Sequence, residues 1–190
     1  SAGPTGPWAV TIGNFDGCHL GHQSLLRAVV DAARALDGPA IAVTFTPRAN
    51  AFFRGVDREV LLFTDAQKTR AFAEAGLDWE IDKRFDEAFS RLTPDAFYDS
   101  CLRRHLRAQV IVIGDNFRFG HGRAGDAAYL ARRGAVDSCS VTVGRAAIDS
   151  GERISSTRVR AALAAGDVDA AAAMLGRPYV LEGTIRRGDQ

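Results

Sequence analysis

The sequence predicts an α/β fold with a doubly wound, mostly parallel sheet. Short runs of apolar and β-branched residues alternate along the chain with segments whose apolar residues recur at helical spacing. Glycine-containing loops, at Gly13 and Gly114, directly follow two of these runs. The chain has 190 residues, 46% of them hydrophobic, which is enough to bury a core. Ligands in such folds bind beyond the carboxyl ends of the strands, where the winding reverses.

The first elements form a βαβ unit. Residues 8–12 are an apolar run that ends at Gly13, and they predict a buried strand. Apolar residues at helical spacing predict a helix over 24–36, closed by Gly38-Pro39. Residues 41–45 predict a second buried strand, parallel to the first.

The remaining elements continue the alternation. In chain order they are a helix at 65–75 with Asp65 as N-cap and Gly76 past its end, a charged strand at 79–85, a helix from Thr93-Pro94 to about Arg107, a strand at 109–113, a helix at 126–133 ended by Gly134, a strand at 140–143, and helices at 157–165 and 168–175 separated by Gly166-Asp167. The segment 177–185 then predicts a new strand, and therefore a domain boundary near Gly176.

Composition excludes several classes of protein. Twenty-four basic residues stand against 23 acidic ones, so there is no global basic field for nucleic acid. The cysteines Cys18, Cys101 and Cys139 show no paired spacing, which disfavours a disulfide scaffold or a zinc ribbon. No apolar run reaches the roughly 18 residues that span a bilayer. We therefore expect a cytoplasmic protein with small-molecule substrates and neither a nucleic-acid nor a membrane partner.

The first candidate motif, residues 13–22, joins the first strand to the first helix. The start of a helix presents free N–H groups and is a ready site for phosphate. His19 and His22 are three residues apart and can point the same way, and Gly21 lets an anion approach the backbone. Two alternatives remain: ordinary loop and cap residues, or a metal site that adds Cys18.

The second motif, residues 153–160, combines hydroxyls with arginines at a helix start. Ser156 and Thr157 fit a helix cap, but Arg153, Arg158 and Arg160 add charge-assisted donors that capping alone does not explain. This pattern favours binding of a polyphosphate.

The third motif, residues 114–123, follows the most apolar strand. Phe117 and Phe119 offer flat apolar surfaces, and Asn116 can both donate and accept hydrogen bonds. The alternative is a flexible surface loop, but the position at the end of a strand favours ligand contact.

These motifs resemble a known family. His19-Leu20-Gly21-His22 with Ile154-Ser155-Ser156-Thr157 is similar to the paired signature of the HxGH nucleotidyltransferases. Together with VIGDNFRFG, they resemble the FMN adenylyltransferase domain of bacterial bifunctional FAD synthetases, over residues 10–175. The resemblance implies a Rossmann-like nucleotidyltransferase domain over 1–175. It further implies that 176–190, with its Gly176-Arg177-Pro178-Tyr179 start, is the first strand of a truncated or absent riboflavin kinase module.

The resemblance implies transfer of AMP from ATP to FMN, giving FAD and pyrophosphate, with Mg²⁺ held mainly by the substrate phosphates. The implied catalytic residues are His19, His22, Ser156, Thr157 and Arg160. Gly13, Phe15, Gly21, Arg153 and Arg158 would bind the nucleotide, and Asn116, Phe53, Phe117 and Thr46 would face the flavin.

One segment departs from the family pattern. After the second strand the family usually has an acidic residue and then Pro-His-Pro, whereas this chain has Thr46-Pro47-Arg48. The departure leaves two alternatives open: a specialised paralogue that uses another nucleotide or a modified flavin, and a flavin- or nucleotide-binding module without turnover. Arg48 offers a guanidinium that can grip a phosphate directly.

Overall fold

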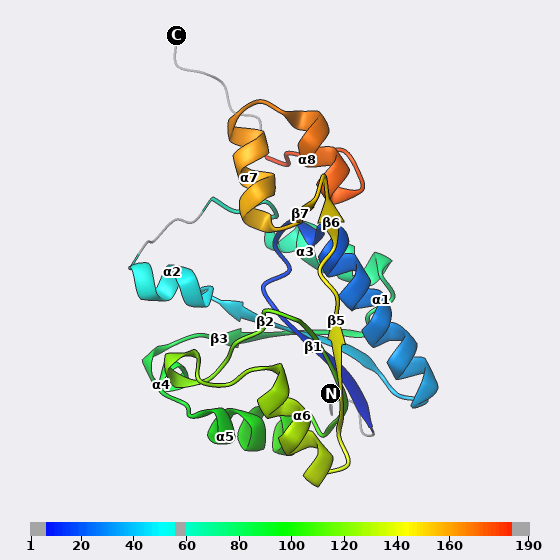
Figure 1. Ribbon diagram of the computed structural model, residues 1–190, viewed down its shortest axis with the longest axis vertical. Coiled ribbons are helices and arrows are strands. Elements are labelled where there is room, and N and C mark those ends of the chain that lie inside the picture. The colour runs from blue at the N-terminus through cyan, green and yellow to red at the C-terminus, as the bar shows by residue number, and fades with distance from the viewer. Residues whose placement is uncertain (1–6, 56–59, 184–190) are drawn as a thin grey trace.

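The computed structural model describes residues 7–55 and 60–183. Its centre is a five-stranded, wholly parallel sheet in the order β3-β2-β1-β4-β5 (Figure 1). The strands are β1 (Trp8–Ile12), β2 (Ala40–Thr46), β3 (Trp79–Arg84), β4 (Ala108–Gly114) and β5 (Ser140–Gly144). The winding reverses at β1, between β2 and β4, so the predicted doubly wound sheet is confirmed.

Helices cover both faces of this sheet (Figure 1). One face carries α1 (Leu20–Ala35) and α3 (Asp65–Glu74), and the other carries α5 (Pro94–Phe97), the π-helical turn η2 (Tyr98–His105) and α6 (Ala127–Val136). The helices α7 (Ser156–Ala164) and α8 (Val168–Leu175) pack against each other at one end of the molecule. Smaller elements are η1 (Asp16–Cys18), α2 (Ala49–Arg54), α4 (Glu87–Ser90), η3 (His121–Arg123) and the hairpin of β6 (Ile148–Asp149) and β7 (Glu152–Arg153).

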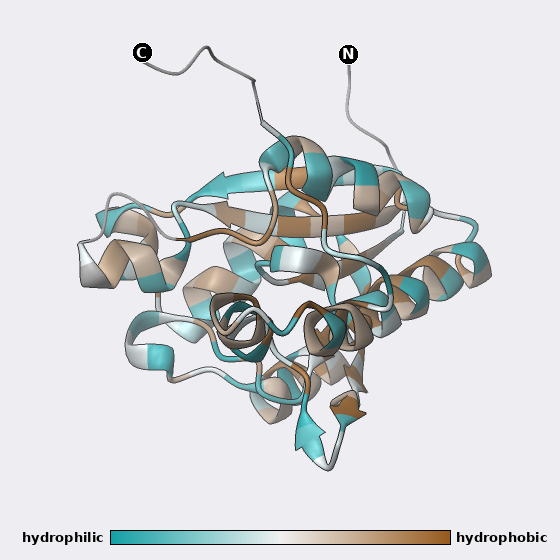
Figure 2. Cartoon of the chain, turned by 90° about the horizontal axis from the view of Figure 1, so that it is seen from above, coloured by the Kyte–Doolittle hydropathy of each residue, from teal (hydrophilic) through white to brown (hydrophobic). Residues whose placement is uncertain are grey.

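The alternation of side chains along β1 explains the two layers. Trp8, Val10 and Ile12 join the core cluster that includes α5, η2 and α6. Ala9, between them, faces α1 in a second cluster, and its small side chain lets that helix lie close to the sheet. Figure 2 shows the central strands mostly in brown, as expected for a sheet buried on both faces.

All five predicted strands of the sheet are confirmed, including the charged one at 79–85. That segment is β3, an edge strand with half-buried or exposed side chains. Charged side chains therefore keep contact with water on this strand.

Three details of the predicted helices were wrong. The helix after β1 begins at Leu20 rather than at residue 24, with His19 as N-cap. The N-cap of α3 is Thr64 rather than Asp65, in a reciprocal capping box with Gln67. Gly134 lies inside α6 and does not end it.

The predicted C-terminal strand does not form in the described residues. Gly176 ends α8 in the left-handed conformation (φ 70°), but residues 178–183 are neither strand nor helix. Residues 184–190 of that prediction lie outside the described part. Across residues 7–55 and 60–183, no helix is both long and apolar enough for a membrane span.

Candidate functional site

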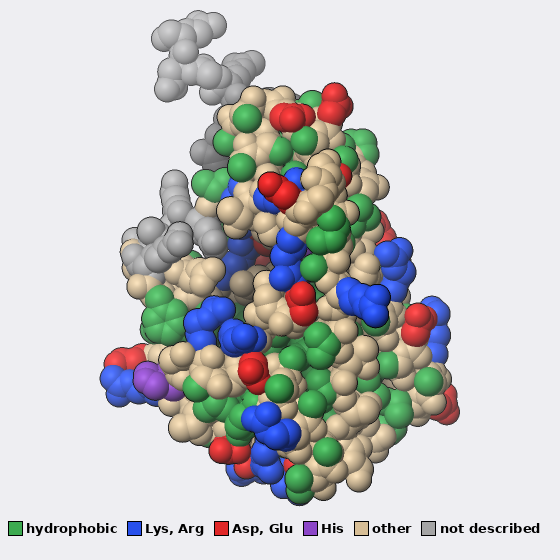
Figure 3. All heavy atoms as spheres, in the orientation of Figure 1, with side chains coloured by type: hydrophobic (Ala, Val, Ile, Leu, Met, Phe, Trp, Pro, Cys, Tyr) green, Lys and Arg blue, Asp and Glu red, His purple; other side chains and the backbone are tan. Residues whose placement is uncertain are grey.

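A cavity of about 330 Å³ lies at the carboxyl ends of β1, β4 and β5. Its walls are the loops after these strands and the start of α7, so it opens where the winding of the sheet reverses. Figure 3 shows Lys and Arg side chains gathered around the hollow between α7 and α2. The three predicted motifs contribute His19, Asn116 and Ser156, among others, to this one cavity.

The loop between β1 and α1 has an unusual backbone. Phe15, Gly17 and Cys18 all have positive φ angles, of 49°, 75° and 38°. Non-glycine residues adopt this region rarely and at a cost, so the surrounding structure must hold the loop in place. Gly21 follows at the start of α1, where a β-carbon would lie 3.2 Å from the His19 ring and crowd it.

The two histidines stack on each other at the wall of the cavity. Their ring centroids are 3.6 Å apart and the planes differ by 15°. The backbone N–H of His22 donates to Nδ1 of His19 at 3.3 Å, so a neutral His19 carries its proton on Nε2. Among the described residues, Nδ1 of His22 is buried without a hydrogen-bond partner.

Burial keeps both rings neutral near pH 7. Desolvation lowers the pKa of His19 to about 4. Desolvation is also the main cause that holds the pKa of His22 well below its usual range. The electrostatic effects of His19 and then of Arg48 lower it further. The pair therefore offers the cavity neutral hydrogen-bonding groups rather than charges.

Asp16 connects three segments beneath the cavity. Its side chain is only 2% exposed and forms a two-pronged ion pair with Arg48, both N–O distances being 2.9 Å. Its carboxylate also accepts from Nη2 of Arg160 and from the backbone N–H groups of Leu62 and Phe63. The carboxylate thus fixes two arginines that line the cavity, which is consistent with the rule that buried charges are paired.

The start of α7 and the hairpin before it supply the opposite wall. Ser155 is the N-cap of α7, and Oγ of Ser156 donates to the carbonyl of Asp16 at 2.9 Å. Thr157 lines the cavity, as does Arg153, which is ion-paired with Asp115.

Arg158, which was expected to bind the nucleotide, does not line the cavity. Its guanidinium turns to the β6–β7 hairpin, where it contacts the side chains of Asp149 and Glu152 and three hairpin carbonyls. Hydrogen bonding within the hairpin therefore draws it away, and it supports the turn that carries Arg153.

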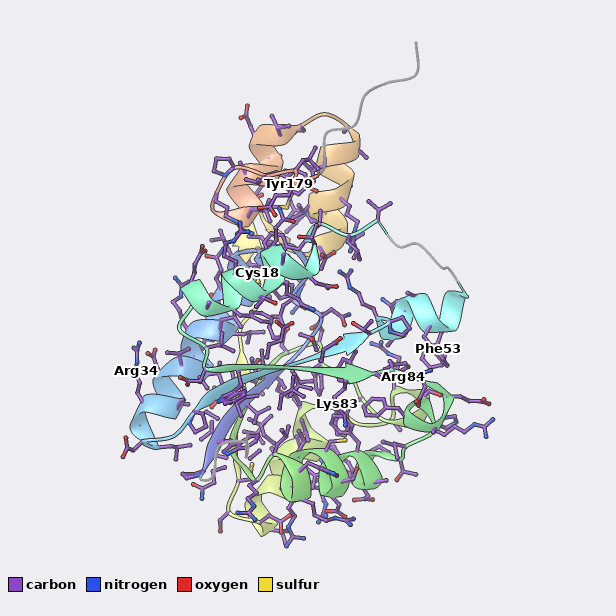
Figure 4. All side chains as sticks on the ribbon, turned by 180° about the vertical axis from the view of Figure 1, so that it is seen from behind. Cys18, Arg34, Phe53, Lys83, Arg84 and Tyr179 are labelled. Atoms are coloured by element: carbon purple, nitrogen blue, oxygen red, sulfur yellow. The ribbon has the colours of Figure 1, made fainter. Side chains whose placement is uncertain are left out.

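The residues predicted to face a flavin divide into two groups. Asn116 and Phe117 line the cavity, whereas Phe53 and Thr46 do not. Thr46 is exposed at the end of β2. Phe53 on α2 is 68% exposed, and its ring centroid is 5.9 Å from that of Phe85; Figure 4 labels Phe53. Phe53 borders a separate aromatic groove of about 360 Å³, whose other aromatic rings are Phe85, Phe89, Phe97 and Phe119.

Two acidic residues of the site were missed by sequence reasoning. Asp16 lies in the first motif and Asp115 in the third, but neither was predicted to take part in the site. A signal was present, because acidic residues among several cationic ones are expected to pair with them.

The metal alternative is not supported for Cys18, which is buried among apolar side chains with its pKa raised to about 12 by desolvation. Within residues 7–55 and 60–183, no three His, Cys, Asp or Glu side chains gather as a possible metal cluster.

Comparison with known proteins gives matches along nearly the whole chain. The FAD synthetase family profile matches residues 4–158. The bifunctional riboflavin kinase/FMN adenylyltransferase of Escherichia coli (strain K12) is 36% identical over 190 residues, which is all of this chain and 61% of that protein. The chain therefore spans about three fifths of the length of this relative.

Two further similarities come from other bacteria. A putative bifunctional riboflavin kinase/FMN adenylyltransferase of Geobacillus thermodenitrificans is 35% identical and is aligned over 89% of both chains. A crystal structure described as a macrolide-efflux protein from Streptococcus pneumoniae superposes with a TM-score of 0.82 at 27% identity, covering 96% of this chain and 62% of that one.

Proposed function

The chain belongs to the FAD synthetase family, and we propose that it transfers the AMP group of ATP to FMN, forming FAD and pyrophosphate. One observation carries the proposal. A neutral histidine pair, two helix starts and four arginines (Arg48, Arg145, Arg153 and Arg160) converge on a single cavity at the switch point of the sheet. Such a concentration of hydrogen-bond donors and positive charge suits a triphosphate.

The two walls of the cavity would divide the nucleotide phosphates between them. His19 and His22, with the start of α1, would contact the phosphates from the β1 side. Ser156, Thr157 and Arg160 would hold the β- and γ-phosphates from α7. Arg153 would move from Asp115 to the phosphates, because a triphosphate carries more negative charge than one carboxylate.

The proposed reaction requires the protein mainly to position the two substrates and to stabilise negative charge. An anionic oxygen of the FMN phosphate attacks the α-phosphorus of ATP and forms a new P–O bond. The bond from the α-phosphorus to the oxygen that bridges to the β-phosphorus breaks, and its electron pair leaves on pyrophosphate. Because the nucleophile is already an anion, no strong general base is required. The donors of the cavity would stabilise charge on the leaving pyrophosphate.

Magnesium would enter on the substrate phosphates and supply charge neutralisation there. The chemistry of the nearest carboxylates supports this assignment. Asp16 is occupied by two arginines and two backbone N–H groups, and Asp115 is paired with Arg153. Both are thus engaged with cations or donors rather than presented for a metal.

The flavin would bind where the β4 loop passes from the cavity to the aromatic groove. Asn116 and Phe117 line the cavity, and Phe119 of the same loop borders the groove with Phe53. Aromatic faces suit the flat isoalloxazine ring, and the ring in this groove would leave the FMN phosphate directed toward the cavity.

The domain assignment stays part of this proposal. We assign residues 1–175 to the nucleotidyltransferase unit. Residues 176–190 would be the junction to a riboflavin kinase module, as the names of the bifunctional relatives suggest.

The test is incubation of the purified chain with FMN, ATP and Mg²⁺, followed by chromatographic detection of FAD. We expect FAD and pyrophosphate in equal amounts, and no FAD when ATP is omitted. A panel of CTP, GTP and UTP, and of modified flavins, tests the specialised-paralogue alternative. A protein that binds FMN and ATP and forms no dinucleotide with any of these substrates would contradict the proposal and favour the binding module.

A further inference from the structure

The carbonyl groups of η1 all accept hydrogen bonds from side chains, and those of Gly17 and Cys18 are held by side chains that do not line the cavity. The carbonyl of Asp16 accepts from Oγ of Ser156 at 2.9 Å. The carbonyl of Gly17 accepts from Nη2 of Arg177 at 2.7 Å. The carbonyl of Cys18 accepts from Nη1 of Arg177 at 3.2 Å and from Nε2 of Gln23 at 2.9 Å. Three consecutive carbonyls are thus fixed by side chains from α1, from α7 and from the segment after α8.

Arg177 makes the largest contribution to this arrangement. Besides the carbonyls of Gly17 and Cys18, its guanidinium donates to the carbonyl of Leu175 at the end of α8, at 3.1 Å. The same group lies over the ring of Phe63, 5.0 Å from the centroid. A planar guanidinium can span several acceptors in fixed directions, which a lysine ammonium does not reproduce. Arg177 does not line the cavity.

The direction of these carbonyls matters for an anion. Carbonyl oxygens carry partial negative charge and would repel phosphates if they turned toward the cavity. The loop has positive φ at Phe15, Gly17 and Cys18, a conformation that persists only where the surroundings enforce it. Contacts on the far side of the loop therefore help to determine which groups the loop presents to the cavity.

We propose that Arg177 is a positioning residue for nucleotide phosphate binding, acting by holding the carbonyls of Gly17 and Cys18 away from the cavity. The inference rests on the proposed function of that cavity. It also connects the segment after α8 to the site. Val180 accepts from Gln67, and Glu182 pairs with Arg70, so this segment is fastened along α3. Figure 4 shows Tyr179 of the segment on the side of the molecule where Cys18 and α3 lie.

The test compares Arg177→Met with Arg177→Lys and with the control Arg70→Met. Methionine keeps an apolar stem near Phe63 but removes the guanidinium group, whereas lysine keeps the positive charge without the planar guanidinium. The control removes the Arg70–Glu182 ion pair, which holds the same segment away from the loop. The readouts are binding of inorganic tripolyphosphate by calorimetry, and the KM values for ATP and for FMN.

We expect Arg177→Met to weaken tripolyphosphate binding by about 10-fold and to raise the KM for ATP similarly, because small misplacements at a binding site are costly. The KM for FMN should stay within about two-fold of wild type, since the aromatic groove is not altered. The tripolyphosphate affinity of Arg177→Lys should lie between those of Arg177→Met and wild type. Guanidinium chloride, below denaturing concentrations, should partly restore tripolyphosphate binding by Arg177→Met. Arg70→Met should match wild type.

Two results would overturn the inference: unchanged tripolyphosphate affinity in folded Arg177→Met, or a parallel rise in both KM values, which would indicate general loosening. If thermal unfolding shows that Arg177→Met does not fold, the tripolyphosphate affinity and the two KM values of Arg177→Lys test the inference instead. Tripolyphosphate binding does not depend on flavin chemistry. A wild-type protein that binds it but makes no FAD would therefore refute the proposed function and leave the role of Arg177 standing on its own measurement.

Discussion

At the scale of single residues, the cavity separates neutral donors from fixed charges. The stacked His19 and His22 are kept neutral by burial, while Arg48 and Arg160 are both ion-paired with the buried carboxylate of Asp16. A neutral imidazole donates a hydrogen bond without adding positive charge to a site that is already lined by four arginines. The histidines are therefore suited to respond to charge that develops on a leaving group.

Substitution of His22 tests whether the neutral histidines donate hydrogen bonds to the leaving group. His22→Ala should cost about 2 to 4 kcal/mol in transition-state stabilisation, because a donor to developing charge is lost. The measurement is kcat for FAD formation, with folding checked by circular dichroism. The control is His105→Ala, an exposed histidine on the π-helical turn, which should leave kcat unchanged. A folded His22→Ala protein with wild-type turnover would remove His22 from the catalytic set.

Thr46 should behave differently, although it stands where the family usually has an acid. Its side chain is exposed and lines neither the cavity nor the aromatic groove. Thr46→Asp should therefore leave the magnesium dependence of FAD formation and the affinity for FMN within about two-fold of wild type, as surface substitutions usually do. FMN affinity is measured by quenching of flavin fluorescence. A marked change in either quantity would return position 46 to the ligand site.

At the scale of elements, the strands and several helix ends, such as the Asp167 N-cap of α8, followed from the sequence, but other helix ends did not. Apolar runs such as residues 109–113 are bounded by polar residues or glycine, so the strand they predict is confirmed as β4. The start of α1 was missed because His19 is an uncommon N-cap, and its acceptor, Nδ1, depends on the tautomer. Short elements such as α2 and the β6–β7 hairpin carry too little periodicity to be predicted from sequence.

At Gly134, tertiary packing overrides the tendency of glycine to end a helix. Glycine near the end of an apolar stretch predicts a helix end, but α6 continues to Val136. A β-carbon on Gly134 would lie 2.3 Å from the carbonyl oxygen of Cys139, so glycine is required for the close turn into β5.

Gly134→Ala should therefore destabilise the fold by about 1 to 3 kcal/mol through steric overlap, even though alanine is the better helix former. The free energy of unfolding is measured by urea denaturation. Gly183→Ala is the control and should be neutral, because a β-carbon there would meet no group of the described residues within 4 Å beyond its chain neighbours. Stabilisation by Gly134→Ala would show that the chain between α6 and β5 relaxes easily.

At the scale of the whole molecule, the site joins residues that are far apart in the sequence. Asp16 is 32 residues from Arg48 and 144 from Arg160. The switch-point rule predicts which loops converge, so the cavity and most of its lining were predictable. The ion pairs were not, because they depend on how α7 and the segment before α3 close over the β1 loop.

This closure has a consequence for the stability of the whole fold. His19 has a pKa of about 4 in the folded protein, against about 6.5 when exposed. Above pH 6.5 the ring is neutral in both states. Between pH 6.5 and 4 only the unfolded chain takes up the proton, so the free energy of unfolding should fall as the pH falls. At about 1.4 kcal/mol per pKa unit, the loss from His19 approaches about 3 kcal/mol near pH 4.

Urea denaturation at intervals from pH 7 to 4.5 measures this loss. His19→Asn keeps a side-chain oxygen that can cap α1 and removes the titrating ring, so its stability should decline less steeply than that of wild type. His105→Asn should keep the wild-type slope, because that ring is exposed. Equal slopes for wild type and His19→Asn would mean that the His19 ring stays accessible to protons in the folded state. The burial that makes the stacked pair neutral donors would then not exist in solution.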